Sequence, residues 1–284
     1  MNIIRDFQKP LSLKNDGQLQ VFFIGVGSAF AESHNQLNFL LIKGDKHIMV
    51  DFGMTGPAAL RQTTGLKQTD LEAILPTHSH ADHVGGIEGL AQINRYVGLR
   101  HMHKPKLTAI INEHYQDILW DRTLRGGLEW NEIAPDSKWA KLKFSDYFDV
   151  IRPTWKTVSP RETYEVDYGD IHLEMFRTNH IPEQSDSWES SFVSYGLFVD
   201  NHVFISVDTK FDQDLIDLYA HRSSVMFHDV QFYPGAVHAQ LEELKTLPDD
   251  IKKKMYLMHY ADNYVDQDIT GFAGWTEQGV IYEP

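Results

Sequence analysis

Cysteine is absent from the 284 residues. This absence excludes disulfides and thiolate metal ligands, so any metal site must use nitrogen and oxygen donors. Long apolar runs are also missing, and the amino terminus lacks the basic start and hydrophobic stretch of a secretory signal. We therefore expect no contact with a membrane and a cytoplasmic location.

Basic residues are scarce relative to acidic ones. The chain has 26 lysines and arginines against 40 aspartates and glutamates, for a net charge of −14. Residues 101–160 are nearly balanced, with 9 basic and 8 acidic residues, so the rest carries 17 against 32. Proteins that bind long RNA usually present a basic patch that neutralises phosphates. This composition disfavours long nucleic acid as a partner and is compatible with a small ligand.

The most informative segment is Thr77–Gly86, Thr-His-Ser-His-Ala-Asp-His-Val-Gly-Gly. It places four potential metal ligands within six positions: His78, His80, Asp82 and His83. Imidazole nitrogens and carboxylate oxygens suit Zn²⁺ or Mn²⁺, and Fe²⁺ is also compatible with them. Since an open catalytic zinc site needs only three protein ligands, the motif indicates two ions that share one loop.

The residues around this motif predict a strand, a loop and a helix. Leu71–Leu75 is a short apolar strand that ends at a proline, and Val84–Ile93 has helical character. The first two histidines then follow the strand, while the aspartate and the third histidine begin the helix. We expect Gly85 and Gly86 to let the backbone pass close to the metals without a Cβ clash.

His-x-His-x-Asp-His after a strand resembles the motif of the metallo-β-lactamase superfamily. Three later residues, each after an apolar strand, match the remaining ligands in order: His180, Asp208 and His259. The resemblance implies a bridging role for Asp208. It also implies one ion on His78, His80 and His180, and a second ion on Asp82, His83 and His259.

Finer motifs resemble ribonuclease Z and its related cyclic-nucleotide phosphodiesterases. Phe22–Phe30 is similar to the opening of that branch, and His228-Asp229 resembles its His-Glu motif with aspartate in place of glutamate. His238, ten residues after His228, corresponds to the proton-donating histidine. A carboxylate that holds a histidine protonated would supply a general acid. The alternative is a helix-facing His238 and a surface Asp229.

The segments Val237–Leu244 and Lys252–Tyr260 are similar to phage-type anti-Pycsar phosphodiesterases. This resemblance implies hydrolysis of 3′,5′-cyclic mononucleotides (cAMP, cGMP, cCMP and cUMP) to linear monophosphates, to disarm antiphage signalling. It also implies a homodimer and, for a phage-encoded chain, the host cytoplasm. Two divalent ions, Zn or Mn, would activate a water, Asp82 would orient it, and His238 held by Asp229 would protonate the leaving oxygen.

Three other functions stay open. A ribonuclease Z-like endonuclease would use the same centre to process the 3′ end of tRNA. A non-catalytic, metal-stabilised protein would bind nucleotides without cleaving them. Hydrolysis of acyl esters or lactones is the third. No long Gly/Pro-rich arm, of the kind that ribonuclease Z uses to hold tRNA, is present in the sequence.

We expect a single α/β domain over residues 1–284, folded as a four-layer αββα metallo-β-lactamase sandwich. Asp51, at the end of a strand, is expected to steady the metal loop. The predicted strands are Val21–Ile24, Phe39–Ile42, His47–Asp51, Ala73–Leu75, Thr163–Val166, Ile171–Arg177, Phe192–Val199, Val203–Val207 and Met255–Leu257.

Residues 101–160 are expected to form an insertion rich in aromatic side chains, with helical spacing over Leu107–Leu119. The insertion is either a lid or dimer contact that stacks on a base, or a segment with its own small core. No other ligand signature accompanies His101, His103 and His114, so we assign them no metal. The aromatic residues are Tyr115, Trp120, Trp130, Trp139, Phe144, Tyr147, Phe148 and Trp155.

Overall fold

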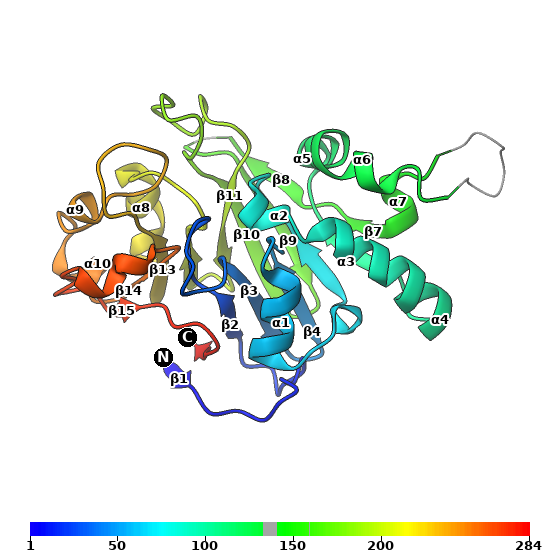
Figure 1. The fold of residues 1–284 in the computed structure, drawn as a ribbon. Coiled ribbons are helices and arrows are strands. Elements are labelled where there is room, and N and C mark those ends of the chain that lie inside the picture. The colour runs from blue at the N-terminus through cyan, green and yellow to red at the C-terminus, as the bar shows by residue number, and fades with distance from the viewer. Residues whose placement is uncertain (133–140, 159) are drawn as a thin grey trace.

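The computed structural model describes residues 1–132, 141–158 and 160–284, which form two mixed eight-stranded sheets packed face to face (Figure 1). The first sheet has the order β1 (Asn2–Ile4), β16 (Ile281–Glu283), β2 (Gln20–Gly25), β3 (Asn38–Lys43), β4 (Lys46–Val50), β5 (Ala73–Leu75), β6 (Leu107–Ile110) and β7 (Phe148–Ile151). The second has the order β15 (Gly274–Trp275), β14 (Met255–Met258), β13 (Val225–Asp229), β12 (Val203–Ile205), β11 (Tyr195–Val199), β10 (Ile171–Arg177), β9 (Thr163–Tyr168) and β8 (Thr154–Thr157).

Aromatic side chains fill the space between the sheets. The fully buried ring of Phe23, on β2, lies 4.9 Å from that of Phe227 on β13 and 5.7 Å from that of Tyr282 on β16. Strands β2 and β3 are buried along nearly their whole length because one face packs on the other sheet and the second face on helices. This double burial explains their continuous apolar sequence.

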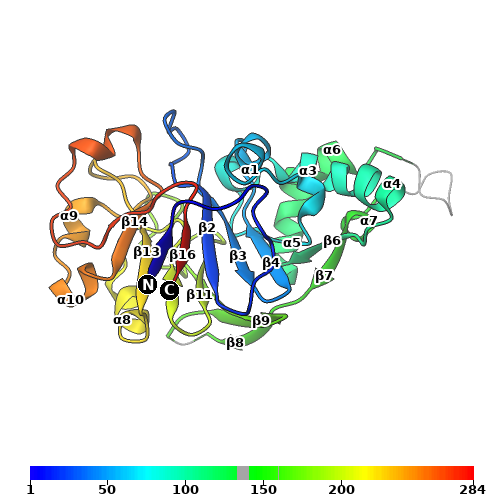
Figure 2. The same cartoon turned by 90° about the horizontal axis from the view of Figure 1, so that it is seen from below.

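Helices cover both outer faces, as Figure 2 shows from below. Helices α1 (Gly56–Thr64) and α3 (Ile87–Ile93) lie over the first sheet. Helix α8 (Gln213–Ala220) covers the second, where its Tyr219 packs on Phe176 and Phe204. These layers confirm the predicted αββα sandwich. Among the described residues, the remaining α-helices are α2 (Ala81–Val84), α4 (Arg100–Met102), α5 (Glu113–Leu119), α6 (Arg125–Leu128), α7 (Phe144–Tyr147), α9 (Leu241–Leu244) and α10 (Asp249–Lys252).

The helical prediction for Leu107–Leu119 is wrong for its first half. Leu107–Ile110 forms β6, which pairs in parallel with β5 and β7. Helix α5 begins only after Asn112, whose side-chain oxygen accepts a hydrogen bond from the Tyr115 backbone N–H at 2.8 Å. A short and largely buried strand such as β6 has the same apolar run as a buried helical turn, so periodicity alone does not separate them.

The aromatic residues of this segment divide into packed and exposed sets. Phe144 stacks on Phe148 with ring centroids 4.6 Å apart, and Trp120 meets Phe144 edge-on. Trp130 and Trp155 are instead largely exposed. Trp139 lies outside the described residues. The segment supplies β6 and β7 to one sheet and β8 to the other, and its status as an insertion stays a prediction.

In the described part of the chain, no helix combines the length and the apolar character that a membrane span requires. The two termini lie side by side, because β1 pairs antiparallel with β16.

Replacement of Phe23 by alanine tests the core between the sheets. Removing a fully buried phenylalanine leaves a cavity, so Phe23→Ala should lower the free energy of unfolding by about 3–5 kcal/mol in a urea titration. Phe30→Ala is the matched control, since this ring is 94% exposed and should change stability by less than about 0.5 kcal/mol. Equal effects of the two changes would contradict this packing.

Candidate metal centre

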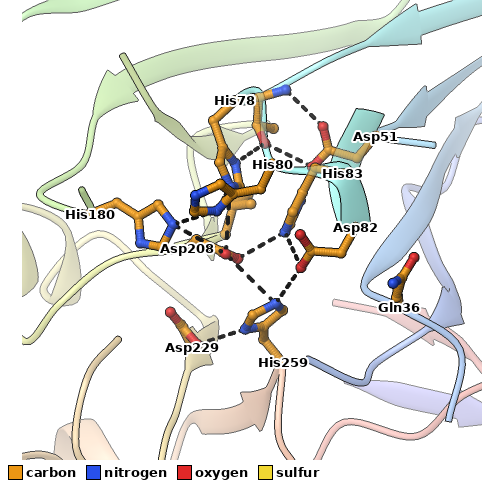
Figure 3. A network of polar contacts seen from close by, with 12 residues as sticks. Gln36, Asp51, His78, His80, Asp82, His83, His180, Asp208, Asp229 and His259 are labelled. Carbon is orange, nitrogen blue, oxygen red and sulfur yellow. Dashed lines mark hydrogen bonds and ion pairs between the residues drawn. The ribbon is translucent and has the colours of Figure 1, made fainter. Parts of the chain in front are cut away.

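The carboxyl ends of β5, β10, β12 and β14 and the start of α2 meet at one edge of the sandwich, and Figure 3 shows their side chains pointing toward one another. All seven residues predicted as metal ligands lie in this cluster, within two overlapping groups that share Asp208. Within each group one ligand atom of every residue lies within 4.8 Å of the others. The seven are His78, His80, Asp82, His83, His180, Asp208 and His259.

The first group consists of three histidines and Asp208. His80 Nδ1 lies 3.1 Å from His78 Nε2 and 3.0 Å from His180 Nε2. Asp208 Oδ2 lies 3.6 Å from the same two Nε2 atoms. The sequence-based grouping of His78, His80 and His180 matches this arrangement.

The second group consists of Asp82, His83, His259 and Asp208. Asp82 Oδ2 lies 3.2 Å from His259 Nε2 and 3.3 Å from His83 Nε2. Asp208 Oδ1 is 3.2 Å from His83 Nε2, and Asp208 Oδ2 is 3.6 Å from His259 Nε2. The two oxygens of Asp208 therefore face both groups.

The polar atoms of this cluster have the arrangement that divalent cations need. Both oxygens of Asp208 and Nε2 of His83 are buried without a hydrogen-bond partner. A buried carboxylate without a partner is costly, and a cation between the two groups would remove that cost. The donors are all nitrogen and oxygen, which suits Zn²⁺ or Mn²⁺.

The carboxylates also control protonation of the histidines. Burial opposes charge on His259, but Asp208 and Asp229 outweigh it and raise the pKa of His259 to about 10. Burial opposes charge on His83 too, yet Asp208 and Asp82 raise its pKa well above the usual value. Burial lowers the pKa of His180 to about 4, so this imidazole is neutral at pH 7.

Asp51 lies behind the cluster and fixes its geometry, as expected from the sequence. Its Oδ2 is 2.7 Å from His83 Nδ1 and accepts a hydrogen bond from the Thr77 hydroxyl at 2.7 Å. Its Oδ1 accepts one from the Thr77 backbone N–H, also at 2.7 Å. These contacts direct His83 Nε2 toward Asp208.

Three residues at the cluster have left-handed backbone conformations: Asp51 (φ 58°), Val207 (φ 52°) and His259 (φ 59°). For a β-branched residue such as Val207 this conformation is strained. The turn there places the next residue, Asp208, between the two groups. The backbone strain at Val207 is therefore associated with the placement of the Asp208 carboxylate between the two groups.

Asp229 and His238 form a close pair beside the second group. His238 Nδ1 lies 2.6 Å from Asp229 Oδ2, and Asp229 Oδ1 lies 3.3 Å from His259 Nδ1. Asp229 is fully buried and His238 lies in a loop, so the alternative of a surface aspartate and a helix-facing histidine is wrong. A third set of four, Asp208, Asp229, His238 and His259, also has metal-ligand spacing.

Sequence reasoning did not anticipate the residues that hold Asp229. Asp229 Oδ2 accepts a hydrogen bond from the Thr209 backbone N–H at 3.0 Å, and Ser206 Oγ accepts one from the Asp229 N–H at 2.9 Å. Ser206 and Thr209 lie on either side of Asp208 in the motif Ser-Val-Asp-Thr. That motif is the sequence feature that could have indicated these contacts. The Thr209 N–H and His238 Nδ1 both contact Asp229 Oδ2. We therefore interpret Asp229 and His238 as a hydrogen-bonded pair rather than as ligands of a third ion.

The expected closeness of Gly85 and Gly86 to the metals stays a prediction. A Cβ on Gly85 would lie 2.5 Å from the Ala81 carbonyl oxygen and 2.6 Å from Met54 Cγ, and one on Gly86 would lie 2.6 Å from the Gly53 carbonyl oxygen. The two glycines therefore let the backbone pass close to α2 and to the loop after β4. His101, His103 and His114 belong to no metal-ligand grouping among the described residues.

Comparison with known proteins identifies the family. The family model described as anti-Pycsar protein Apyc1 matches residues 19–282. This chain belongs to the anti-Pycsar Apyc1 family. An Apyc1 relative from Paenibacillus harenae is 35% identical over 268 residues, which cover 94% of this chain and 98% of the relative. An Apyc1 relative from Bacillus phage BSP38 is 32% identical over 254 residues, which cover 87% and 91%.

Solved structures agree with the fold of this Apyc1 family member. The metallo-β-lactamase fold protein YhfI from Bacillus subtilis matches with a TM-score of 0.68 at 16% identity, over 94% of this chain and all of YhfI. The short form of human tRNase Z matches with a TM-score of 0.61 at 17% identity, over 93% and 99%. These likenesses show a shared metallo-β-lactamase fold.

The raised histidine pKa values make metal binding dependent on pH. Below about pH 10, His259 of the metal-free protein holds a proton that an incoming ion must displace. Titration with Zn²⁺ or Mn²⁺ should therefore release protons, and affinity should rise from about pH 6 to about pH 8. Calorimetry in buffers of different ionisation enthalpy measures this release, and an enthalpy independent of the buffer would contradict it.

Proposed function

We propose that this Apyc1 family member is a two-metal phosphodiesterase that opens 3′,5′-cyclic mononucleotides to linear monophosphates. The observation that carries the proposal is the pair of buried donor groups that share Asp208. Two cations a few Å apart can stabilise both the attacking and the leaving oxygen of a phosphoester. Zn²⁺ or Mn²⁺ are the ions we propose for these nitrogen and oxygen donors.

The protein side chains have separate tasks in this proposal. Bound ions would supply a water of lowered pKa and positive charge beside the phosphoryl oxygens. Asp208 holds the two groups at a fixed separation, because each of its oxygens faces at least one of them. Asp82, buried between His83 and His259, keeps the second group together and orients the attacking oxygen.

His238 is the proposed general acid. Its Nδ1 is held by Asp229 at 2.6 Å, which leaves Nε2 free to carry a proton toward the leaving alkoxide. The His238 side chain remains 16% exposed, so a substrate can reach it, whereas Asp229 is fully buried. The Asp229 carboxylate fixes the orientation of the imidazole, which a positioned acid needs.

Two observations favour a small substrate. The net charge of −14 is unlike the basic surface of proteins that bind long RNA. The relatives also carry the anti-Pycsar name, which fits enzymes that destroy cyclic mononucleotide signals. We further propose a single domain with an aromatic insertion at residues 101–160, a homodimer, and action in the cytoplasm.

Turnover of a substrate panel tests the proposal. Protein loaded with Mn²⁺ or Zn²⁺ should convert cyclic AMP, GMP, CMP and UMP to linear monophosphates and leave a precursor tRNA with a 3′ trailer intact. Asp82→Ala should abolish this turnover. Cleaved tRNA with intact cyclic nucleotides would instead favour the endonuclease. Tight nucleotide binding by the fully metallated protein without any product would favour the binding protein.

His238→Ala tests the general acid. Loss of a positioned acid should lower kcat about 10²–10⁴-fold while the bound metal content stays unchanged. His172→Ala is the matched control, because His172 Nδ1 also lies 2.6 Å from a carboxylate, that of Asp167, but on the outer part of the second sheet. Parent-like turnover by His238→Ala would remove His238 from the mechanism.

A further inference from the structure

Lys210 holds one loop of the candidate centre through its side-chain ammonium. Its Nζ donates hydrogen bonds to the backbone carbonyls of Pro182 at 3.0 Å, Glu183 at 2.8 Å and Ser185 at 2.7 Å. It also donates to the Ser185 hydroxyl at 2.9 Å. An ammonium has three protons, so these four acceptors use its whole capacity.

The same lysine is connected to Asp208 along the chain and to the loop of His180 through hydrogen bonds. It follows Asp208 by two residues, and its backbone N–H donates to the Asn179 carbonyl at 2.7 Å. The Ser185 hydroxyl donates to the Asn179 side-chain oxygen at 2.6 Å. Residues 179–185, which include His180, are therefore held at both ends by the loop that follows β12.

This loop also contacts the turn that precedes His238. A carboxylate oxygen of Glu183 accepts a hydrogen bond from the Ala236 N–H at 3.2 Å, and His180 Nδ1 lies 2.8 Å from the Val237 carbonyl oxygen. Ala236 has a φ of 65°, a left-handed conformation that is unfavourable for alanine. A non-glycine residue stays in this conformation only when its surroundings hold it there.

We propose that Lys210 is a positioning residue that places both a first-group ligand and the proposed acid. Through residues 182–185 it sets His180 against Asp208, and through Glu183 it sets the turn that presents His238. Arginine cannot replace it fully, because a planar guanidinium does not reach carbonyls that converge from three directions on one nitrogen. The inference rests on the proposed function for the role of His238.

We call the hydrogen bonds of Lys210 Nζ to residues 182–185 the Lys210 clamp. Lys210→Met tests this clamp with two readouts other than activity. Bound metal after dialysis should fall because one of two positions loses affinity about 10–100-fold. Amide hydrogen exchange should accelerate in residues 179–185 and 235–238. Lys254→Met is the matched control: Lys254 Nζ also donates to two backbone carbonyls, of Ala220 and Ser223, but away from the centre. It should keep the parent metal content and the parent exchange in both loops.

Each result of this comparison decides the proposal. Parent metal affinity at both positions in Lys210→Met, or unchanged exchange in the two loops, would overturn it. If the parent itself binds no metal, the proposed function fails, and the exchange comparison still tests the clamp. Should Lys210→Met fail to fold, Lys210→Arg retains the charge and should show the same changes to a smaller extent.

Glu183→Ala separates the two parts of the proposal. It leaves every hydrogen bond of Lys210 Nζ in place, because Lys210 contacts only the Glu183 backbone carbonyl. Metal content should therefore stay at the parent level while kcat falls and KM changes little. Glu189→Ala, which changes another exposed glutamate of the same region, should leave both unchanged. Parent kcat in Glu183→Ala would show that the loop does not position His238.

Discussion

The whole centre depends on one buried carboxylate. Both oxygens of Asp208 lie out of contact with solvent and without a hydrogen bond, surrounded by imidazoles from both donor groups. Such a charge is tolerated only if cations, or protons on its neighbours, compensate for it. The raised pKa values of His83 and His259 indicate that protons on these histidines compensate for the charge in the metal-free protein. A pair of divalent ions would compensate for it in the metal-bound protein.

The fold surrounds Asp208 with donors because strand ends from both sheets meet at one edge of the sandwich. Contacts outside the cluster then position two of the donors: Asp51 directs His83, and the strained Val207 precedes Asp208. Asp229 joins the centre to the proposed chemistry, because its two oxygens face His238 and His259. The clamp at Lys210 extends the same principle to a loop without regular structure.

Sequence alone predicted the parts of the site that lie close together in the chain or follow an apolar strand. The local motif at His78 and the strands β2 to β5 are of this kind. The sequence did not predict β13, because this short strand ends in the polar residues His228 and Asp229 and so lacks a clear apolar pattern. It assigned Leu107–Ile110 to a helix because the short apolar run there fits helical spacing as well as it fits a strand. Lys210 could not be predicted, since no spacing reveals which carbonyls a lysine will meet.

The central claim is that Asp208 holds two ions together. Anomalous diffraction from crystals loaded with Zn²⁺ or Mn²⁺ tests it most directly, because it locates each ion relative to its ligands. The account predicts two peaks on either side of the Asp208 carboxylate, one among His78, His80 and His180 and one among Asp82, His83 and His259. A single peak, or ions that do not touch Asp208, would contradict it.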